Sequence, residues 1–267
     1  MSDDFFSRYE FFKFERNGKI LNIILNNPEK LNCFSETGHR ELSRVFFDAA
    51  EDLDSEIIVV TGAGRAFTAG GDLEYMQKLR DNPELMHRTI REAKRFVYTL
   101  LDCEKPVICK VNGDAIGLGT TLSFLADITF STETAKFGDP HNNVALIAGD
   151  GGSVIWPQLM GYARAKHYLF TGDILSGSKA QELGLIHQAV PAEALNAEVD
   201  AYCQRLLAMP MQSVRWTKQV INIPLKQLAH SMMDAGMAYE HIAGQTQDHQ
   251  EAINAFRERR KPVFKGK

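Results

Sequence analysis

The chain has 267 residues, of which 44% are hydrophobic and 24% charged, so it is long enough to bury a sizeable core in one main domain. Its formal net charge of −4 gives no sign of a strongly basic face, which argues against nucleic acid or an anionic membrane as a partner. Four cysteines without paired spacing, and no apolar run of membrane-spanning length, favour a cytoplasmic protein without a metal site.

The first predicted elements are two strands joined by a tight turn. Residues 11–15 and 20–25 are largely apolar, and Asn17-Gly18 lies between them. This dipeptide between two apolar runs is the strongest short signal for a β-hairpin. We therefore expect the chain to open with strands.

Helices and strands then alternate along the chain. Helical spacing over 42–49 precedes the β-branched strand 57–60, and a helix over 83–101 precedes the strand 106–111. A further strand is expected at 128–130, after a segment of small residues. Such alternation implies βαβ crossovers and a largely parallel sheet, whose ligand sites lie at the carboxyl ends of the strands.

The last third of the sequence is expected to be helical almost throughout. Ser178 begins a pattern that resembles a helix capping box, and amphipathic stretches follow at 194–207 and 225–242. We therefore divide the chain into a core, 1–190, and a C-terminal helical region, 191–267. The apolar residues of the helical region predict a docking or oligomerisation role.

Glycine-rich segments follow two of the predicted strands. The first, 64–73, lacks the Gly-Lys-Ser/Thr ending that a nucleotide P-loop requires. The second, 112–119, resembles a dinucleotide fingerprint only loosely, because the third glycine is missing after Gly117-x-Gly119. Each segment alone is also explained by turn chemistry, since glycine permits positive φ in any loop.

Together and in this order, the two segments resemble the paired signatures of the crotonase (enoyl-CoA hydratase/isomerase) superfamily. The pattern Phe-x-Ala-Gly-[Ala/Gly]-Asp-[Leu/Ile] is matched by Phe67 to Leu73. Further segments similar to this superfamily cover nearly the whole chain, namely 25–32, 137–140, 169–172, 180–186 and 256–264.

The resemblance implies an α/β fold with a spiral core of ββα turns and a C-terminal helical region that builds trimers. It implies that copies of the chain form a homotrimer or, as a dimer of trimers, a homohexamer. It also implies an acyl-CoA substrate, with no cofactor apart from the coenzyme A that the substrate carries.

The same resemblance assigns an oxyanion hole to the backbone amides of Gly71 and Leu118. A thioester carbonyl gains negative charge as an enolate forms, and preorganised N–H donors lower that barrier by several kcal/mol. Leu118 occupies a position that usually holds glycine in this superfamily. Its amide can serve, but its side chain must find room.

The resemblance places the coenzyme A part of the substrate against Lys30, Ala69, Asp72 and Leu73, with basic residues near Arg260 and Lys261. A lysine suits a phosphate as a point charge, although a surface lysine is often only solvated. Side chains from Tyr75 to Tyr98 are expected to shape the acyl pocket.

The acid and base groups depart from the family pattern. The two glutamates with which enoyl-CoA hydratases add water align with Thr121 and His141. Neither residue is a carboxylate, and a threonine is no general base near neutral pH without a partner. The hydration mechanism that uses two glutamates therefore cannot be transferred unchanged.

Asp150, before Gly151, is the strongest candidate for proton transfer. An acid at this position resembles the reactive aspartate of dienoyl-CoA isomerases and other members of the superfamily. Burial near a pocket would raise its pKa and let it exchange protons with a substrate carbon. With His141 nearby, this favours a lyase or isomerase that acts on a thioester enolate.

An alternative comes from a local resemblance to 6-oxocamphor hydrolase and related β-diketone hydrolases. His141, Asp150 and Glu240 stand where those enzymes have their reactive histidine, aspartate and glutamate. His141 would activate water, oriented by Glu240, while Asp150 protonates carbon in a retro-Claisen cleavage of a β-diketone or β-keto-acyl-CoA. Those hydrolases, however, carry a further histidine where this chain has Leu118.

Less specific readings stay open as well. Asp150 could be a turn residue, Glu240 a solvated helix residue or a subunit contact, and the whole chain a catalytically inactive CoA-binding protein. The remaining histidines have no partner pattern and are expected at the surface or in an interface; among them are His167, His187, His230 and His249.

Overall fold

The computed structural model describes residues 6–267, and its first strands form the expected hairpin. Strands β1 (Phe12–Asn17) and β2 (Ile20–Leu25) pair antiparallel along their whole length. The pairing continues to Asn17 and Ile20, so the turn is two residues long and not four. Gly18 has φ +56, a conformation that glycine adopts without strain.

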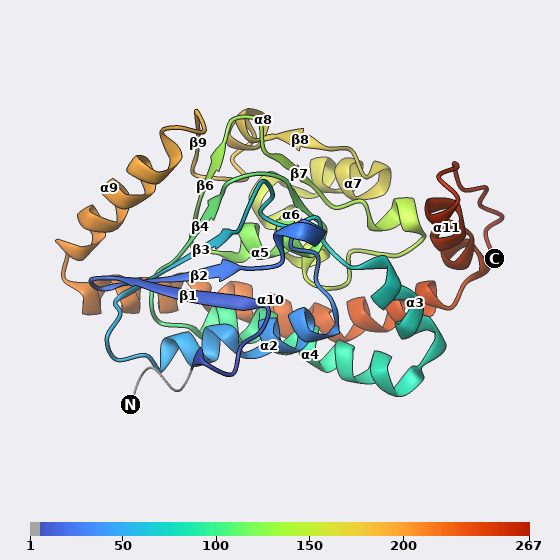
Figure 1. Ribbon diagram of the computed structural model, residues 1–267, viewed down its shortest axis with the longest axis horizontal. Coiled ribbons are helices and arrows are strands. Elements are labelled where there is room, and N and C mark those ends of the chain that lie inside the picture. Colours follow the sequence, from blue (N-terminus) through green and yellow to red (C-terminus); the bar gives the residue numbers. More distant parts are fainter. Residues whose placement is uncertain (1–5) are drawn as a thin grey trace.

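The main sheet has six strands in the order β1-β2-β3-β4-β6-β9 (Figure 1). All neighbours apart from β1 and β2 run parallel, through β3 (Ile57–Gly62), β4 (Val107–Val111) and β6 (Ile128–Thr132). Every residue of β3 is buried, as expected for a parallel strand covered on both faces. The predicted parallel sheet is confirmed.

The last strand of this sheet, β9 (Gln188–Val190), was not predicted, and it lies in a last third that is otherwise helical almost throughout. It pairs parallel with β6 over three residues. So short a strand carries no readable alternation, and only its pairing with β6 makes it a strand.

A smaller sheet brings the functional segments together. It contains β5 (Ala115–Ile116), β7 (Lys136–Gly138) and β8 (Leu175–Ser176). Gly117 N donates to Gly138 O at 2.8 Å, and Ile116 N donates to Thr68 O at 3.0 Å. These bonds hold the exits of β3, β5 and β7 side by side.

Three long helices pack below the sheets in the view of Figure 1: α2 (Glu36–Ala50), α4 (Pro83–Asp102) and α10 (Met211–Gly244). The N-terminus of α2 is capped by Ser35, whose side chain accepts from Gly38 N, and α4 is capped in the same way by Asn82. Phe46 and Phe96, both buried, meet between α2 and α4 with ring centroids 6.2 Å apart. Helices expected at 42–49 and 83–101 are thus confirmed.

The other helices are short and mostly connect strands: η1 (Pro28–Lys30), α3 (Leu73–Asp81), α5 (Leu118–Leu125), η2 (His141–Val144), α6 (Gly152–Met160), α7 (Tyr162–Thr171), α8 (Gly177–Glu182), α9 (Leu195–Leu207) and α11 (Gln247–Arg257). Helix α8 begins earlier than predicted. Its capping oxygen belongs to Ser176, which accepts from Lys179 N, and not to Ser178.

The C-terminal helical region is confirmed, with α9 and α11 at opposite ends of α10 (Figure 1). Helix α10 begins well before the predicted stretch 225–242 and is continuous through Pro224. Ala229, Met233 and Met237 bury one of its faces in the core. No helix of residues 6–267 is long and apolar enough to cross a membrane. The boundary at residue 190 stays a prediction.

Candidate active site

One cavity of about 620 Å³ opens between the strand exits and helices α3, α10 and α11, and its lining is mostly apolar. This volume falls in the range of small-molecule sites. Nine of the residues that the sequence predicted for the site lie on its wall: Lys30, Ala69, Gly71, Asp72, Leu73, Leu118, His141, Asp150 and Glu240.

The two predicted amide donors come from the exits of β3 and β5. Phe34 N donates to Gly70 O and Asp72 N donates to Phe34 O, so the amide of Gly71 between them points away from this ladder. Leu118 is the first residue of α5, where a helix leaves its N–H groups unpaired. Within residues 6–267, neither amide donates a hydrogen bond.

Glycine is required where these two exits touch. A Cβ on Gly70 would lie 2.8 Å from Ile116 O, and Gly70 also has φ +90. Only glycine allows so close an approach in that conformation. The side chain of Leu118 has found room in the hydrophobic core and is only 4% exposed.

His141 follows the end of β7 and is held by a residue that the sequence analysis gave no role. Its Nδ1 contacts Oδ1 of the fully buried Asp139. A carboxylate can only accept, so Nδ1 carries the proton and Nε2 is left for the cavity. The signal in the sequence was an aspartate two residues before the histidine, directly after a strand.

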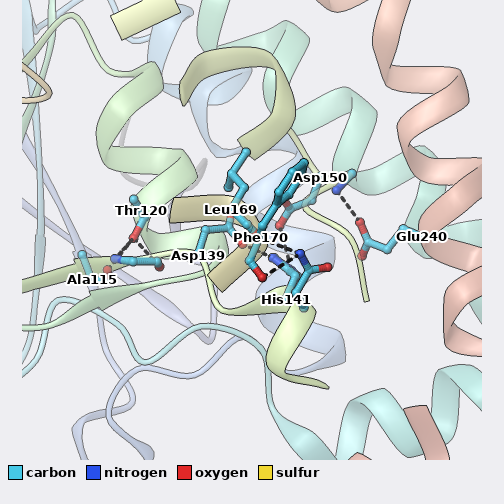
Figure 2. Close-up of polar contacts among 11 residues, drawn as sticks. Ala115, Thr120, Asp139, His141, Asp150, Leu169, Phe170 and Glu240 are labelled. Atoms are coloured by element: carbon cyan, nitrogen blue, oxygen red, sulfur yellow. Dashed lines mark hydrogen bonds and ion pairs between the residues drawn. The ribbon is translucent and has the colours of Figure 1, made fainter. Parts of the chain in front are cut away.

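Asp150 lies on the other side of the His141 ring (Figure 2). Its Oδ2 is 3.9 Å from Nε2 of His141, and its buried Oδ1 has no hydrogen-bond partner among the described residues. The chain turns sharply here, since Gly151 has φ +123 and a Cβ on it would lie 2.9 Å from Thr121 Cγ2.

Glu240 reaches the same cluster from α10 and is half-buried, which corrects the prediction of a solvated helix residue. The prediction of a subunit contact stays a prediction. Its Oε2 accepts from Gly149 N at 3.0 Å. The backbones touch at this point, because a Cβ on Gly149 would lie 2.4 Å from Gly236 O. This glycine contact brings α10 close enough for Glu240 to stand beside Asp150 (Figure 2).

The pKa values of His141, Asp150 and Glu240 in this cluster all differ from the ordinary values of these groups. Burial alone would lower the pKa of His141, but the charges of Asp139 and Asp150 raise it well above its ordinary value. Burial and the charge of Asp139 raise the pKa of Asp150 against the opposing charge of His141. Burial, with the charge of Asp150, raises the pKa of Glu240 to about 8. Near neutral pH, His141 is therefore an imidazolium and Glu240 mostly a neutral acid.

Thr121, which aligns with one of the hydratase glutamates, does not line the cavity. It is fully buried, and its hydroxyl has no hydrogen-bond partner among the described residues. This supports the expectation that hydration by two glutamates does not operate here.

Asp139, His141 and Asp150 offer ligand atoms that all lie within 4.8 Å of one another, a spacing that a divalent cation could use. The Nδ1 atom of His141 is already bonded to Asp139, however, and the second oxygen of Asp139 lies against Gly152, where a Cβ would be 2.3 Å away. A metal would thus have only His141 Nε2 and Asp150 readily available. The expectation of a site without metal stays a prediction.

The residues predicted to meet coenzyme A lie at the start of α3 and in η1. Asp72 caps α3 by accepting from Glu74 N and Tyr75 N. Lys30 stands 3.4 Å from Asp72 and 3.7 Å from Glu74, so a phosphate would have to compete with these carboxylates. Arg260 pairs with Glu251 and Glu258, and neither Arg260 nor Lys261 lines the cavity.

The predicted acyl-pocket segment lines the cavity over most of its length, through Tyr75, Met76, Leu79, Arg80, Met86, Thr89 and Ala93. Tyr98 does not take part. It stacks on His230, with ring centroids 4.5 Å apart.

Three histidines that the sequence analysis did not place in the site also line the cavity: His39, His241 and His249. Burial lowers the pKa of His39 to about 4, so its imidazole is neutral. His249 is 3% exposed and donates from Nδ1 to Val144 O at 2.7 Å, which corrects its predicted surface position. It is buried because α11 folds back over η2, and nothing local in the sequence signals that contact.

Comparisons with known proteins agree with this geometry. The family model described as "Enoyl-CoA hydratase/isomerase" matches residues 15–267. A 1,2-epoxyphenylacetyl-CoA isomerase of Escherichia coli is 33% identical over 93% of this chain and 95% of its own. An enoyl-CoA hydratase/isomerase structure from Mycobacterium paratuberculosis is 34% identical, with a TM-score of 0.89 over 92% of this chain and 99% of its own. A β-diketone hydrolase structure from the cyanobacterium Anabaena, bound to (S)-3-oxocyclohexyl acetic acid, is 30% identical, with a TM-score of 0.85 over 91% of this chain and 97% of its own.

Proposed function

The chain belongs to the enoyl-CoA hydratase/isomerase family, and on this premise we propose that it is an acyl-CoA isomerase that moves a proton with Asp150. The observation that carries the proposal is the place of Asp150. Asp150 lines the same cavity as Gly71 and Leu118, whose amides are unpaired, and one of its carboxylate oxygens has no hydrogen-bond partner among the described residues. A base and an oxyanion hole in one apolar cavity are the parts that enolate chemistry needs.

The reaction begins when the thioester carbonyl accepts hydrogen bonds from the amides of Gly71 and Leu118. Asp150 removes a proton from the α- or γ-carbon, and the electron pair of the broken C–H bond forms the enolate. Asp150 then returns the proton to the other end of the conjugated system, so the double bond migrates and no atom is gained or lost. A raised pKa makes Asp150 a stronger base than an ordinary carboxylate.

His141 acts through Asp150 in this mechanism. As an imidazolium 3.9 Å from Oδ2, it keeps the carboxylate ionised in spite of burial. Asp139 fixes the ring from the other side and so positions His141. Both are positioning residues rather than groups that touch the substrate carbon.

Isomerisation is favoured over hydration because it needs one group that removes and returns a proton. Hydration needs a second group to deliver water to the β-carbon. Thr121 lies outside the cavity, and Glu240 is held by Gly149 N and is mostly protonated near neutral pH. The pair of carboxylates that would share the work is therefore missing.

Retro-Claisen hydrolysis is the second candidate, and the meeting of His141, Asp150 and Glu240 in one cluster favours it. The similarity to a β-diketone hydrolase structure points the same way. Its weak point is electrostatic. To activate water, His141 would have to be neutral, whereas Asp139 and Asp150 hold a proton on it.

The deciding experiment offers 2-enoyl-, 3-enoyl- and cyclic β-keto-acyl-CoA thioesters and free β-diketones to the protein in D2O. Products are followed by mass spectrometry for the wild type, Asp150→Asn and the control Asp200→Asn, which changes an exposed aspartate on α9. We expect double-bond migration with deuterium uptake that only Asp150→Asn abolishes. Carbon–carbon cleavage would replace this proposal by the hydrolase, and binding without any turnover would leave a CoA-binding protein.

We propose that coenzyme A enters only as part of the substrate and that copies of the chain form a trimer or a hexamer. Exposed apolar side chains of α10 support association, among them Trp216, Val220 and Ile221. A cytoplasmic location is supported by the four cysteines, which are all free thiols. Sedimentation of the purified protein would test the oligomeric state.

A further inference from the structure

Arg80, in the last turn of α3, is a cation on the wall of the cavity. Its Nη1 donates to Gly244 O at 2.6 Å and to Thr246 O at 2.9 Å. These carbonyls belong to the C-terminal end of α10 and to the connection that leads to α11. The guanidinium is thereby fixed in place, with two of its three nitrogens left over.

The left-over nitrogens have no partner in the described part of the chain. Nε and Nη2 of Arg80 donate no hydrogen bond, and no carboxylate lies within 4.0 Å of the guanidinium. The other lysine or arginine on the cavity wall, Lys30, differs in this respect, because Asp72 and Glu74 face it.

The surroundings of Arg80 are poor in counter-charge. Met76 and Leu79 precede it on the cavity wall. The neighbouring His249 has a lowered pKa, mainly because it is buried and to a smaller extent because of the positive charge of Arg80. A neutral imidazole offers no negative charge. Arg80 is half-buried, and a ligand that covered its free edge would desolvate the guanidinium, which is costly unless an anion pairs with it.

A purely structural role explains only part of this arrangement. A cation at the C-terminus of α10 stabilises that helix, and Nη1 alone makes the two bonds that do so. It gives no reason for the free Nε and Nη2 edge of a residue that lines the cavity. Such an edge of a guanidinium matches the two oxygens of a carboxylate.

The position along α3 separates this group from the coenzyme A side. Asp72 caps the beginning of α3 and Arg80 lies near its end, about 12 Å away at roughly 1.5 Å per residue. Tyr75, Met76 and Leu79 of the acyl wall lie between them. An anion at Arg80 would therefore belong to the acyl group and not to the phosphates of coenzyme A.

We propose that Arg80 binds a carboxylate at the far end of the acyl group, so that the substrate is a thioester of a dicarboxylic acid. This inference rests on the proposed acyl-CoA function and adds the class of acyl group to it. Recognition would place the reacting carbons between two fixed points, the amides at Gly71 and Leu118 and the guanidinium.

Binding of unreactive saturated thioesters tests the proposal without any turnover. Adipyl-CoA and hexanoyl-CoA differ only in a terminal carboxylate against a methyl group, and calorimetry compares them on the full-length protein. We expect the wild type to prefer adipyl-CoA by roughly 10- to 100-fold, the range of a charged hydrogen-bonded pair. Arg80→Gln should abolish this preference, and Arg80→Lys should retain part of it.

The matched control is Lys78→Gln, which removes the same charge from an exposed position on the same helix. It should keep the preference, and melting curves show whether each variant is folded. Equal binding of both thioesters by the wild type, or an equal loss of both in Arg80→Gln, would overturn the proposal and leave the acyl-CoA function intact. If neither thioester binds to the wild type, the acyl-CoA function is overturned and this inference with it.

Discussion

The two walls of the cavity are built in different ways. One wall presents backbone amides at the exits of β3 and β5, next to glycines that let the two segments touch. The other presents side chains of Asp139, His141 and Asp150, joined by Glu240 from a helix ninety residues further along the chain. The amide wall tolerates a change of side chain, as Leu118 shows, whereas the acidic wall depends on the identity and charge of each residue.

Asp150→Asn removes the proposed base from the acidic wall and should have the largest effect on activity. An amide cannot take up the proton, so we expect kcat to fall by about 10²–10⁴-fold, the usual contribution of a general base. Steady-state isomerase kinetics measure the loss, and a melting curve excludes unfolding. A loss of less than about tenfold would mean that Asp150 is not the base.

Leu118→Pro removes one N–H group from the amide wall without changing the charge of the site. Proline removes the N–H, and the first position of a helix is where it is best tolerated. We expect kcat to fall by about 10²–10³-fold, as when one oxyanion donor is removed.

Leu118→Ala keeps the amide and removes only the side chain, so it should retain most of the activity. It also serves as the stability control, since both variants lose the same buried side chain. Equal losses in the two variants would show that the side chain matters and would remove the contrast between the walls.

Asp139→Asn tests whether the acidic wall depends on charge, because it removes the negative charge of Asp139 and keeps an oxygen that can accept from His141. Because Asp139 helps to raise the pKa of His141, its neutralisation should lower that pKa. Activity that needs the imidazolium is present below this pKa and lost above it, so its alkaline limit should move to lower pH. The pH profile of kcat/KM and the NMR titration of His141 test this, and an unmoved alkaline limit contradicts it.

Glu240→Gln should have the smallest effect if the protein is an isomerase. With a pKa raised to about 8 by burial, Glu240 is mostly neutral near pH 7, and glutamine reproduces that neutral form and the acceptor for Gly149 N. We expect a change of less than about threefold in kcat, well below the contribution of a general base. A loss of a hundredfold or more, with cleaved products in the wild type, would favour the hydrolase.

The fold was readable from the sequence wherever the signal is local. The hairpin signalled by Asn17-Gly18, the buried strand 57–60 and the helix over 83–101 each depend on residues that are neighbours in the chain, and each was confirmed. The segments of the amide wall were also predicted from a local signal, because Gly70 and Gly117 lie within the glycine-rich exits that resemble the family signatures. The role of these amides as an oxyanion hole stays a prediction.

The rest was decided by contacts between distant segments. The strand β9 exists because β6 offers it an edge, and His249 is buried because α11 returns over η2. The partner of His141 and the free edge of Arg80 become visible only once packing is known. The sequence by itself determined most of the sheet, the exits and nine of the residues that line the cavity. Tertiary structure decided their proton affinities and counter-charges, since these depend on burial and on charges brought close by the fold.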